Sequence, residues 1–600
     1  MEFRTVDEVR RLTDRVSTFG GYNHTVSCGD GQYFEMKNMS NNDFPVLTPR
    51  KRRGITKALT APYGMLDKET VYYVDDGKLY ADGVEVPLPG LTLSAEEKTM
   101  AKMGAYIIIM PDKIWLNTKD GTCGSMEKSF DYTGTVTMNI CSQTGAIITW
   151  HDSAYYDSHA PKDGDYMLST VNEKASLKVY SQITASWNPV NTTYFQINAT
   201  GIGAGFDKED GVKITVDATG WDYAQYVFPN EEEDGKRSNN MAIIDKNDDS
   251  IVVVGLLDNN KTFSNFHITV ERKVPDMAFI TECNNRLWGC SKDGHELYCC
   301  KLGDVKNWNT FMGLSTDAWA ATVGSDGVFT GAITFLGYPI FFKEDSLIKI
   351  AVSATGAHQT KETICRGVQR GSHKSIAIIN EMLVYKSTTD VCVYTGAMPA
   401  SISDALGEVR YGSAVGGSID NRYYISMQDA KGKWHMFCYD RRSNTWCKED
   451  NTHALYFCTH DDDLYFVDAD DNKIKSVNGT YMFEDAENKL EKAIDWSAES
   501  GMITYEVAEA KYVAKLSIRV TMYNGATMDI YLVHDGGELE HKVSIYGNGT
   551  RSVTVPFTPK RCDHFKYILI GKGDCKIHSI TKSYEGGSDV TYGGGYPTIS

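Results

Sequence analysis

Two cysteines and two histidines near the C-terminal end are of residue types that bind zinc. Cys562 and His564 form one pair, and Cys575 and His578 form a second pair about a dozen residues later. The first pair has C-x-H rather than C-x-x-C spacing, and the segments around both pairs alternate in polarity like sandwich strands. We therefore predict buried free thiols and no metal, with a zinc site as the alternative.

A calcium-loop pattern occurs at Asp468, Asp470 and Asn472, which take positions one, three and five. Position six is Lys473 instead of glycine, and position twelve is Gly479 instead of glutamate. An EF-hand is excluded, and an Asp-rich β-turn is favoured over a looser calcium site.

Catalytic motifs are missing from the sequence. There is no Walker loop and no nucleophile elbow, and the zincin-like start at His295 and Glu296 has Cys299 where the second histidine is needed. Propeller glycosidases use paired carboxylates, but acidic residues are too numerous here to single out a pair. We predict no catalytic residue, no cofactor and no metal, and that the chain is not an enzyme.

One strongly basic run stands out in an acidic chain of net charge −18: Arg50, Lys51, Arg52 and Arg53. Pro49 and Gly54 flank it, which is typical of a solvated turn. The alternative is a contact with an acidic partner or DNA. Because charged rims set register between subunits, we predict that the run contacts a neighbouring protein subunit. An acidic surface would let DNA pass without binding it tightly.

The elements that must position these residues are mostly short strands. Many segments alternate in polarity between Gly, Asp or Asn turns, and glycine is frequent with 53 residues. Seven segments share a strand–turn–strand plan, which suggests propeller blades, with stacked sandwiches or a solenoid as rivals. Trp288, Trp308, Trp434 and Trp446 recur at similar hairpin positions and are predicted to pack the blades. The seven segments are 71–88, 104–116, 278–302, 337–350, 380–394, 421–439 and 454–477.

The spacing predicts four parts in an all-β chain. Residues 1–124 hold an N-terminal segment and the first blades, and 125–275 form an inserted β domain with longer strands. The remaining blades follow in 276–484, and 485–600 form a β-sandwich with a glycine-rich tail. In the sandwich, Ala514, Leu516, Ile518 and Val520 are predicted to face inward.

One helix is predicted, at residues 6–16. Val6, Val9, Leu12 and Val16 have roughly helical spacing, and Thr5 is a candidate N-cap. The longest strongly apolar stretch, 105–110, is too short to span a bilayer, and the N-terminus has charges where a secretory signal would be apolar. We expect no membrane insertion.

Several segments together resemble virion proteins of tailed bacteriophages from Firmicutes hosts, and more distantly the β-propeller nozzle and stabilisation proteins of short-tailed phages. The resemblance covers about two thirds of the chain and is weakest at 125–275. Its segments are 36–50 (MKNMSNNDFPVLTPR), 285–298 (NRLWGCSKDGHELY), 302–309 (LGDVKNWN), 338–344 (YPIFFKE), 411–420 (YGSAVGGSID), 446–450 (WCKED), 559–565 (PKRCDHF) and 571–573 (GKG).

This resemblance implies a structural role in the virion, in a homo-oligomeric ring of the tail or neck whose lumen carries DNA as transiting cargo. Other tail or neck proteins would be its partners, and assembly would take place in the bacterial cytoplasm. A receptor- or glycan-binding tail protein is the alternative, because propellers and sandwiches present loops for binding. A propeller-type glycoside hydrolase is the third candidate.

Overall fold

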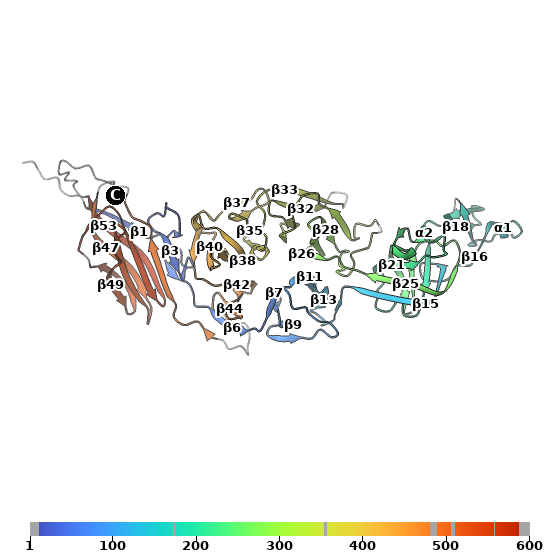
Figure 1. Cartoon of the computed structure of the whole chain (residues 1–600), viewed down its shortest axis with the longest axis horizontal. Helices are drawn as coiled ribbons and strands as arrows, with labels where there is room; N and C mark the ends of the chain where they lie inside the picture. The colour runs from blue at the N-terminus through green and yellow to red at the C-terminus, as the bar shows by residue number, and fades with distance from the viewer. Residues whose placement is uncertain are drawn as a thin grey trace, which may run out of the picture.

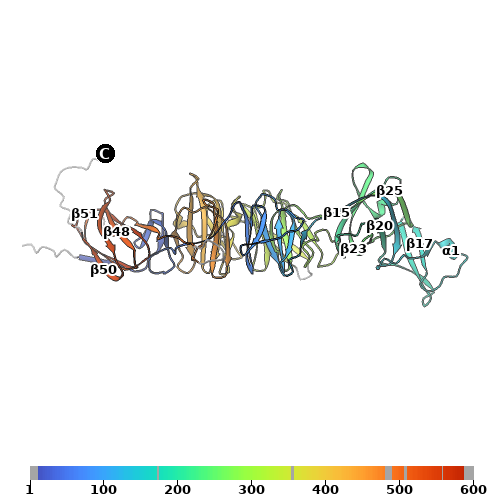
Figure 2. The ribbon, with the colours of Figure 1, turned by 90° about the horizontal axis from the view of Figure 1, so that it is seen from below.

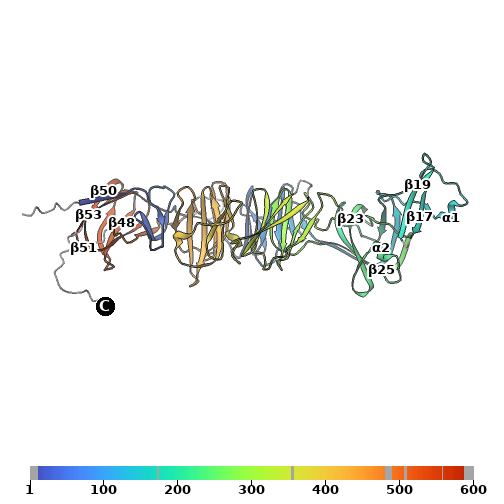
Figure 3. The same ribbon diagram turned by 90° about the horizontal axis from the view of Figure 1, so that it is seen from above.

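The computed structural model of the chain describes residues 11–171, 174–311, 313–352, 357–479, 489–505, 510–556 and 558–586. Strands make up nearly all of its regular structure, so the all-β class predicted from the sequence is confirmed. Figure 1 shows three parts in a row: a C-terminal sandwich, a central ring of sheets and an inserted domain. Figures 2 and 3 show the ring edge-on between the other two parts.

The ring is a β-propeller of seven four-stranded antiparallel blades among the described residues. Blades 1 to 3 are β7 (Pro62–Lys68), β8 (Thr70–Asp75), β9 (Lys78–Ala81) and β10 (Val84–Val86); β11 (Thr99–Met103), β12 (Tyr106–Met110), β13 (Ile114–Asn117) and β14 (Cys123–Ser125); and β26 (Met277–Cys283), β27 (Arg286–Ser291), β28 (Glu296–Cys299) and β29 (Trp319–Thr322).

Blades 4 and 5 are β30 (Gly331–Phe335), β31 (Tyr338–Phe342), β32 (Ser346–Val352) and β33 (His358–Ile364); and β34 (Ala377–Ile379), β35 (Met382–Lys386), β36 (Val391–Tyr394) and β37 (Ala400–Ser401). Blades 6 and 7 are β38 (Tyr411–Ile419), β39 (Arg422–Asp429), β40 (Trp434–Asp440) and β41 (Thr445–Lys448); and β42 (Ala454–His460), β43 (Asp463–Asp468), β44 (Lys473–Ser476) and β6 (Gly54–Ala58).

The ring closes because a strand from the N-terminal part completes the last blade. β6 is antiparallel to β44, with Gly54 opposite Ser476 and Ala58 opposite Lys473. The first strands of the blades line the centre of the ring, and β42 of blade 7 contacts β7 of blade 1. The two ends of the propeller sequence are therefore held together by main-chain hydrogen bonds.

Tight turns join the first and second strands of the blades on one face of the ring. Asn284, Asn380, Asp420 and Asp461 have φ angles of 54°, 41°, 52° and 48° in these turns. Asn and Asp tolerate this left-handed conformation better than other non-glycine residues. This backbone requirement explains why the hairpins in the sequence are bounded by Asn, Asp and Gly.

Apolar side chains fill the spaces between blades. Trp288 and Leu297 of blade 3 cluster with Phe341 and Ile348 of blade 4. The packing role predicted for the tryptophans is confirmed for three of them, which are at most 3% exposed; Trp434 is half-buried and stacks on His453 at 3.8 Å. The three buried tryptophans are Trp288, Trp308 and Trp446.

The inserted domain, between blades 2 and 3, is a closed barrel. β21 pairs with both β25 and β23, so the sheet joins on itself. Its strands are β15 (Lys128–Cys141), β20 (Tyr194–Asn198), β21 (Gly211–Asp217), β23 (Lys236–Asn247), β24 (Ser250–Val254) and β25 (Lys261–Arg272), with β22 (Asn230–Glu231), α2 (Ala224–Val227) and η1 (Glu233–Gly235) beside them.

A second, smaller sheet lies at the far end of the inserted domain (Figure 1). It consists of β16 (Trp150–His151), β17 (Tyr166–Val171), β18 (Lys174–Ser181) and β19 (Ser186–Pro189), beside the short helix α1 (Ser153–Tyr156). Residues 126–276 contain 22 acidic and 12 basic residues, so more than half of the net charge of −18 lies in this domain.

We expect the propeller to fold without the inserted barrel. Lys128 and Arg272 are opposite each other in the first ladder of the barrel, about 5 Å apart, so two glycines can replace residues 128–272. Circular dichroism should show a β-rich protein with a cooperative melt. The melting midpoint should fall, because Asn307 of the propeller loses hydrogen bonds to Gly211 and Asp210 at 2.8 and 3.1 Å.

Deletion of blade 4, residues 331–364, is the matched control, because the ring cannot close around a missing blade. It should abolish the cooperative melt. If the barrel deletion also melts without cooperativity, the barrel is part of the propeller's folding unit.

The C-terminal sandwich packs two sheets face to face, and its core is continuous with apolar residues of blades 5 and 6 in the largest apolar cluster of the described chain. One sheet contains β1 (Arg11–Val16), β53 (Cys575–Gly586), β47 (Lys511–Met522), β50 (Gly549–Val555) and β51 (Arg561–Cys562). The other contains β3 (Gln32–Lys37), β46 (Asp495–Ser500), β52 (Phe565–Lys572), β48 (Thr527–His534) and β49 (Glu540–Tyr546).

The second sheet continues into the propeller. β2 (Gly21–Tyr22) pairs with β3 on one side and with β41 of blade 6 on the other, where Tyr22 lies opposite Trp446. Ten strands thus form one sheet that spans both domains. The short elements β4 (Met39–Ser40), β5 (Thr48–Pro49) and β45 (Lys489–Leu490) lie near this connection, and η3 (Asp404–Leu406) precedes blade 6.

The helix predicted at residues 6–16 is wrong for its described part. Residues 11–16 form β1, which is antiparallel to β53 with Val16 opposite Ile580. Ladder hydrogen bonds to the edge of the sandwich outweigh a helical spacing of apolar residues too short to be stable alone. Residues 6–10 lie outside the described residues. Nowhere in the described chain is there a helix with the length and apolarity needed to cross a membrane.

Candidate functional site

The basic run lies where the chain passes from the sandwich to blade 7, and Arg50 is buried there. Its guanidinium forms a bidentate ion pair with the carboxylate of Glu491, with N···O distances of 2.7 and 2.9 Å. Its Nε donates to the side-chain oxygen of Asn38 at 2.8 Å. Paired hydrogen bonds to one carboxylate fix both position and orientation. Arg50 therefore holds the N-terminal segment against residues that follow the propeller.

Arg53 is buried three residues later among acids of the loop after blade 6. It pairs with Glu449 and Asp450, both at 2.8 Å, and donates to the hydroxyl of Thr452 at 2.7 Å. Its guanidinium also lies over the ring of Phe466, 5.0 Å from the centroid. The next residue, Gly54, begins the strand that closes the ring, so this cluster anchors the closing strand.

Burial and charge act in opposite directions on these groups. Burial raises the pKa of Asp450, but Arg53 and Arg50 lower it more, so that the pKa lies below its usual value. Burial lowers the pKa of Arg53, and Asp450 and Glu449 raise it well above the ordinary range. For Glu449 the effect of burial is larger than that of the Arg53 charge, so its pKa is raised above the usual value. Asp450 is thus the ionised partner that both arginines share.

The prediction of a subunit contact for all four residues is corrected for two of them. Arg50 and Arg53 are 4% and 5% exposed and belong to the interior. The acids that neutralise them, at positions 449, 450 and 491, are about 400 residues away in sequence and gave no local signal. Lys51 is exposed and Arg52 is half-buried, so these two remain accessible.

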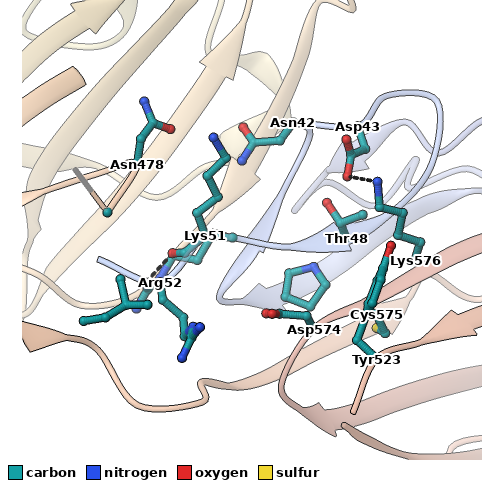
Figure 4. A pocket seen from close by; sticks show the side chains of 14 residues that line it. Asn42, Asp43, Thr48, Lys51, Arg52, Asn478, Tyr523, Asp574, Cys575 and Lys576 are labelled. Carbon is teal, nitrogen blue, oxygen red and sulfur yellow. Dashed lines mark hydrogen bonds and ion pairs between the residues drawn. The ribbon is translucent and has the colours of Figure 1, made fainter. Parts of the chain in front are cut away.

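Lys51 and Arg52 line a cleft of 480 Å³ between the propeller and the sandwich (Figure 4). Tyr523 and Lys576 border it from the sandwich, and Asn478 borders it from the end of blade 7. Lys576 pairs with Asp43 at 3.0 Å. Within the part of the chain that the structure describes, the side chains of Lys51 and Arg52 form no ion pair. Among the described residues the cleft therefore presents two unpaired cations beside the exposed carboxylate of Asp574, and the excess of positive charge suits a carboxylate or phosphate.

The centre of the propeller is crossed by a polar contact that the sequence analysis missed. Glu97, before the first strand of blade 2, pairs with His373 and Lys374, before that of blade 5, at 3.0 and 3.3 Å. The ring of Phe279 from blade 3 is 5.1 Å from His373, and Lys374 lies 4.5 Å from the ring centroid of Tyr456 in blade 7. Side chains of four blades thus meet across this end of the channel.

The four zinc-type residues do not come together. Cys562 lies opposite Lys511 and Cys575 lies opposite Met522, which are at the two ends of β47. Eleven residues of strand separate these positions, about 36 Å. In the calcium-like segment, Asp468 accepts from the amide of Asp470 at 3.1 Å and from Lys475 at 2.6 Å, as an Asp-rich turn does.

Two neighbouring carboxyl groups in the sandwich, those of Asp14 and Asp30, have pKa values shifted in opposite directions. Burial and a hydrogen bond with Asp14 raise the pKa of Asp30, whereas the hydrogen bond with Asp30 and the charge of Lys582 lower that of Asp14. Lys582 is buried and contacts both carboxylates. Opposite pKa shifts of this kind occur in acid–base pairs and also in buried ion-pair clusters, to which this pair belongs through Lys582. It lies at the β1–β53 edge of the sandwich and not in the propeller.

No protein-family model and no curated protein matches the chain. Among solved structures, the exo-β-1,3-galactanase of Phanerochaete chrysosporium is 9% identical and covers 51% of this chain and 95% of its own, with a TM-score of 0.20. AztD of Citrobacter koseri is 11% identical and covers 72% of this chain and 100% of its own, with a TM-score of 0.24.

The prediction that the chain is not an enzyme is corrected here. Glycoside hydrolases, including the galactanase and an engineered xylanase–arabinofuranosidase, are among the solved structures to which the chain is similar. TM-scores of 0.19 and 0.20 transfer no substrate, reaction or catalytic residue to this chain.

Proposed function

We propose that this chain is a structural subunit of a tailed-bacteriophage virion, in a homo-oligomeric ring of the tail or neck through which DNA passes. Its partners would be further copies of itself and adjoining tail or neck proteins. The resemblance of the segments around residues 36–50, 285–309 and 338–344 to phage virion proteins motivates the proposal.

The junction between propeller and sandwich is the observation that supports this proposal most. A ten-stranded sheet and the buried pairs of Arg50 and Arg53 join the two domains into one stiff unit. Such stiffness suits a subunit that must keep its shape within a ring. Because Glu97 contacts His373 and Lys374 across the propeller channel, the DNA lumen of such a ring would lie between copies and not inside one propeller.

The cleft with Lys51 and Arg52 is the surface through which the subunit would contact a neighbour. Its unpaired cations favour an acidic segment, and the chain as a whole is acidic. Charged contacts of this kind set orientation and discriminate between partners. The same acidity disfavours tight binding of the passing DNA.

Reversing the two accessible charges tests this role. The double variant Lys51→Glu/Arg52→Glu should fold like the wild type, because neither side chain is buried, but its incorporation into particles should fall about tenfold. Quantitative mass spectrometry of purified particles measures the copies incorporated. Lys431→Glu/Lys433→Glu, with the same charge change on an exposed turn of blade 6, is the control and should assemble normally.

Normal incorporation of the first variant would contradict the contact. Tight binding of duplex DNA at physiological salt by the wild type, lost in the same variant, would instead identify the pair as a DNA clamp.

A receptor- or glycan-binding role is the second candidate. The observation that favours it is the polar pocket of 680 Å³ in the inserted barrel, which Asp222, Gln225 and Lys236 line.

A further inference from the structure

The hairpin turn between β30 and β31 of blade 4 contains a leucine where the other blades have polar residues or glycine. In all seven blades the turn between the first two strands contains a residue with left-handed backbone, and in blade 4 this residue is Leu336, with a φ angle of 51°. The corresponding residues of the other blades are Glu69, Gly104, Asn284, Asn380, Asp420 and Asp461. A bulky apolar residue is an outlier in this conformation.

The leucine is not explained by the turn itself. Asn, Asp or Gly would adopt the same backbone at a lower free-energy cost, as the other turns show. The side chain of Leu336 is also exposed, so it does not contribute to the core of the blade. Strained backbone is found preferentially at sites that have a function. Leu336 therefore points to a contact made by this face of the propeller.

Further exposed apolar side chains lie near Leu336 on the same face. A side chain added at Gly396, in the loop between β36 and β37, would come within 3.6 Å of the Leu336 Cδ1 atom, and Met398 belongs to the same loop. The end of β32 at Val352 is level with the turn of Leu336, because Ile340 lies opposite Lys349.

The turn of blade 3 extends this surface. Cys283 contacts the carbonyl oxygen of Gly337, and Asn285 accepts from the amide of Gly303 at 2.9 Å. The preceding residue, Leu302, donates its amide to Thr316 in the same loop. We call the exposed apolar side chains of this surface the apolar sector. They are 44% to 63% exposed and comprise Leu302, Leu314, Leu336, Val352 and Met398.

Exposed charged side chains occupy the remaining part of the face. They begin at Glu381 in the turn of blade 5 and continue through Asp420 and Arg442 of blade 6, Asp462 of blade 7 and Glu69 of blade 1. An apolar partner that covered these charges would have to remove their water, which is costly. The partner surface is therefore confined to blades 3 to 5 and is itself apolar there.

The face is accessible, and its apolar sector has the size of an interaction site. Figures 2 and 3 show the described parts of the sandwich and the barrel beside the ring and not on its faces. Five half-exposed side chains present several hundred Å² of apolar surface, which monomeric proteins rarely leave in contact with water. Because a stable dimer buries about 800 Å² per partner, we expect an association of moderate strength.

We propose that the apolar sector binds the same sector of a second copy of this chain. A two-fold axis places identical surfaces against each other, so an apolar sector is its own complement. The charged turns of blades 1, 6 and 7 then stay outside the contact in both copies. The contact uses no residue of the cleft at Lys51 and Arg52, and the inference does not rest on the proposed role in a virion.

Sedimentation velocity of the full chain between 1 and 100 µM tests the proposal. The wild type should show a monomer–dimer equilibrium with a dissociation constant of about 1–100 µM. Leu336→Asn should weaken it at least tenfold. In dilute solution, where the protein is monomeric, the same variant should raise the melting midpoint by about 1–2 °C, because asparagine relieves the backbone strain.

Two further variants separate the contact from unspecific effects. Met398→Ser removes an apolar side chain of the sector without changing a strained turn, and it should weaken the dimer as well. Leu539→Asn is the matched control, since Leu539 is equally exposed but lies in the sandwich, and it should associate like the wild type.

Three outcomes would overturn the proposal. The first is a wild type that stays monomeric at 100 µM. The second is a dimer that neither Leu336→Asn nor Met398→Ser weakens. The third is an association that is lost in Lys51→Glu/Arg52→Glu and kept in Leu336→Asn, which would place the contact between copies at the cleft.

Discussion

Replacing Arg53 with methionine should lower the free energy of unfolding by about 3–5 kcal/mol, because it leaves buried acids without their cation. Glu449 is buried and Asp450 nearly so, and both contact Arg53 at 2.8 Å. Arg53 also precedes β6, so the closing strand of the propeller loses its anchor. Urea denaturation followed by tryptophan fluorescence should show a lower midpoint for the variant.

The neighbouring Arg52 provides the matched control, since its side chain lines the cleft and forms no ion pair with the described residues. Arg52→Met should change the free energy of unfolding by less than about 0.5 kcal/mol. Equal effects of the two substitutions would mean that the buried cluster does not hold the closing strand.

The stability of the wild type should rise between pH 8 and pH 10 relative to a Lys386→Met variant. Lys386 ends β35 in the interior of blade 5, and its ammonium donates to Gln369 at 3.0 Å and to the carbonyl oxygen of Ser387. Burial lowers its pKa from 10.5 to about 8, despite the charge of Asp390. Above pH 8 the Lys386 ammonium of the folded protein loses its proton. In the unfolded chain the same group stays protonated until the pH approaches its ordinary pKa of 10.5.

The direction follows from proton linkage. Between pH 8 and pH 10 the unfolded state binds more protons than the folded state, so the free energy of unfolding increases with pH. As the pH falls through 8, Lys386 becomes charged in the folded protein and the free-energy cost of burying that charge returns. The difference between pKa values of about 8 and 10.5 for Lys386 corresponds to about 3 kcal/mol. Denaturation midpoints of both proteins at pH 7, 8, 9 and 10 measure the difference, because other titrating groups act equally on both. Parallel pH profiles would show that Lys386 is not a desolvated ammonium.

The propeller could be predicted from local sequence because its repeating unit is local. Each blade needs a hairpin turn with left-handed backbone, which selects Asn, Asp or Gly at positions such as 284, 380, 420 and 461. The closing strand β6 could not be predicted in this way, since its partner β44 is more than 400 residues later. Long-range pairing also made a strand of residues 11–16, where apolar spacing suggested a helix.

Inside strands the alternation was reliable until a bulge interrupted it. Leu516, Ile518 and Val520 are fully buried as predicted, but Val513 takes the inward place expected for Ala514. The register of β47 against β53 shifts between Val513 and Lys515. An extra residue in a strand reverses the faces of all residues before it, and no local feature of the sequence marked it.

The candidate site was only half predictable for the same reason. A run of four basic residues looks the same in a sequence whether its side chains are buried or exposed. The acidic residues that pair with Arg50 and Arg53 in the interior come from distant loops. The contact between Glu97 and Lys374 joins residues of blades on opposite sides of the ring.

Cryo-electron microscopy of the particles that contain this protein tests the central proposal most directly. We expect several copies in a closed ring at the tail or neck, with the DNA path between copies and the propeller channels filled by Glu97, His373 and Lys374. Lys51 and Arg52 should face the adjoining subunit. Absence of the protein from purified particles, or its presence as separate copies away from the DNA path, would contradict the proposal.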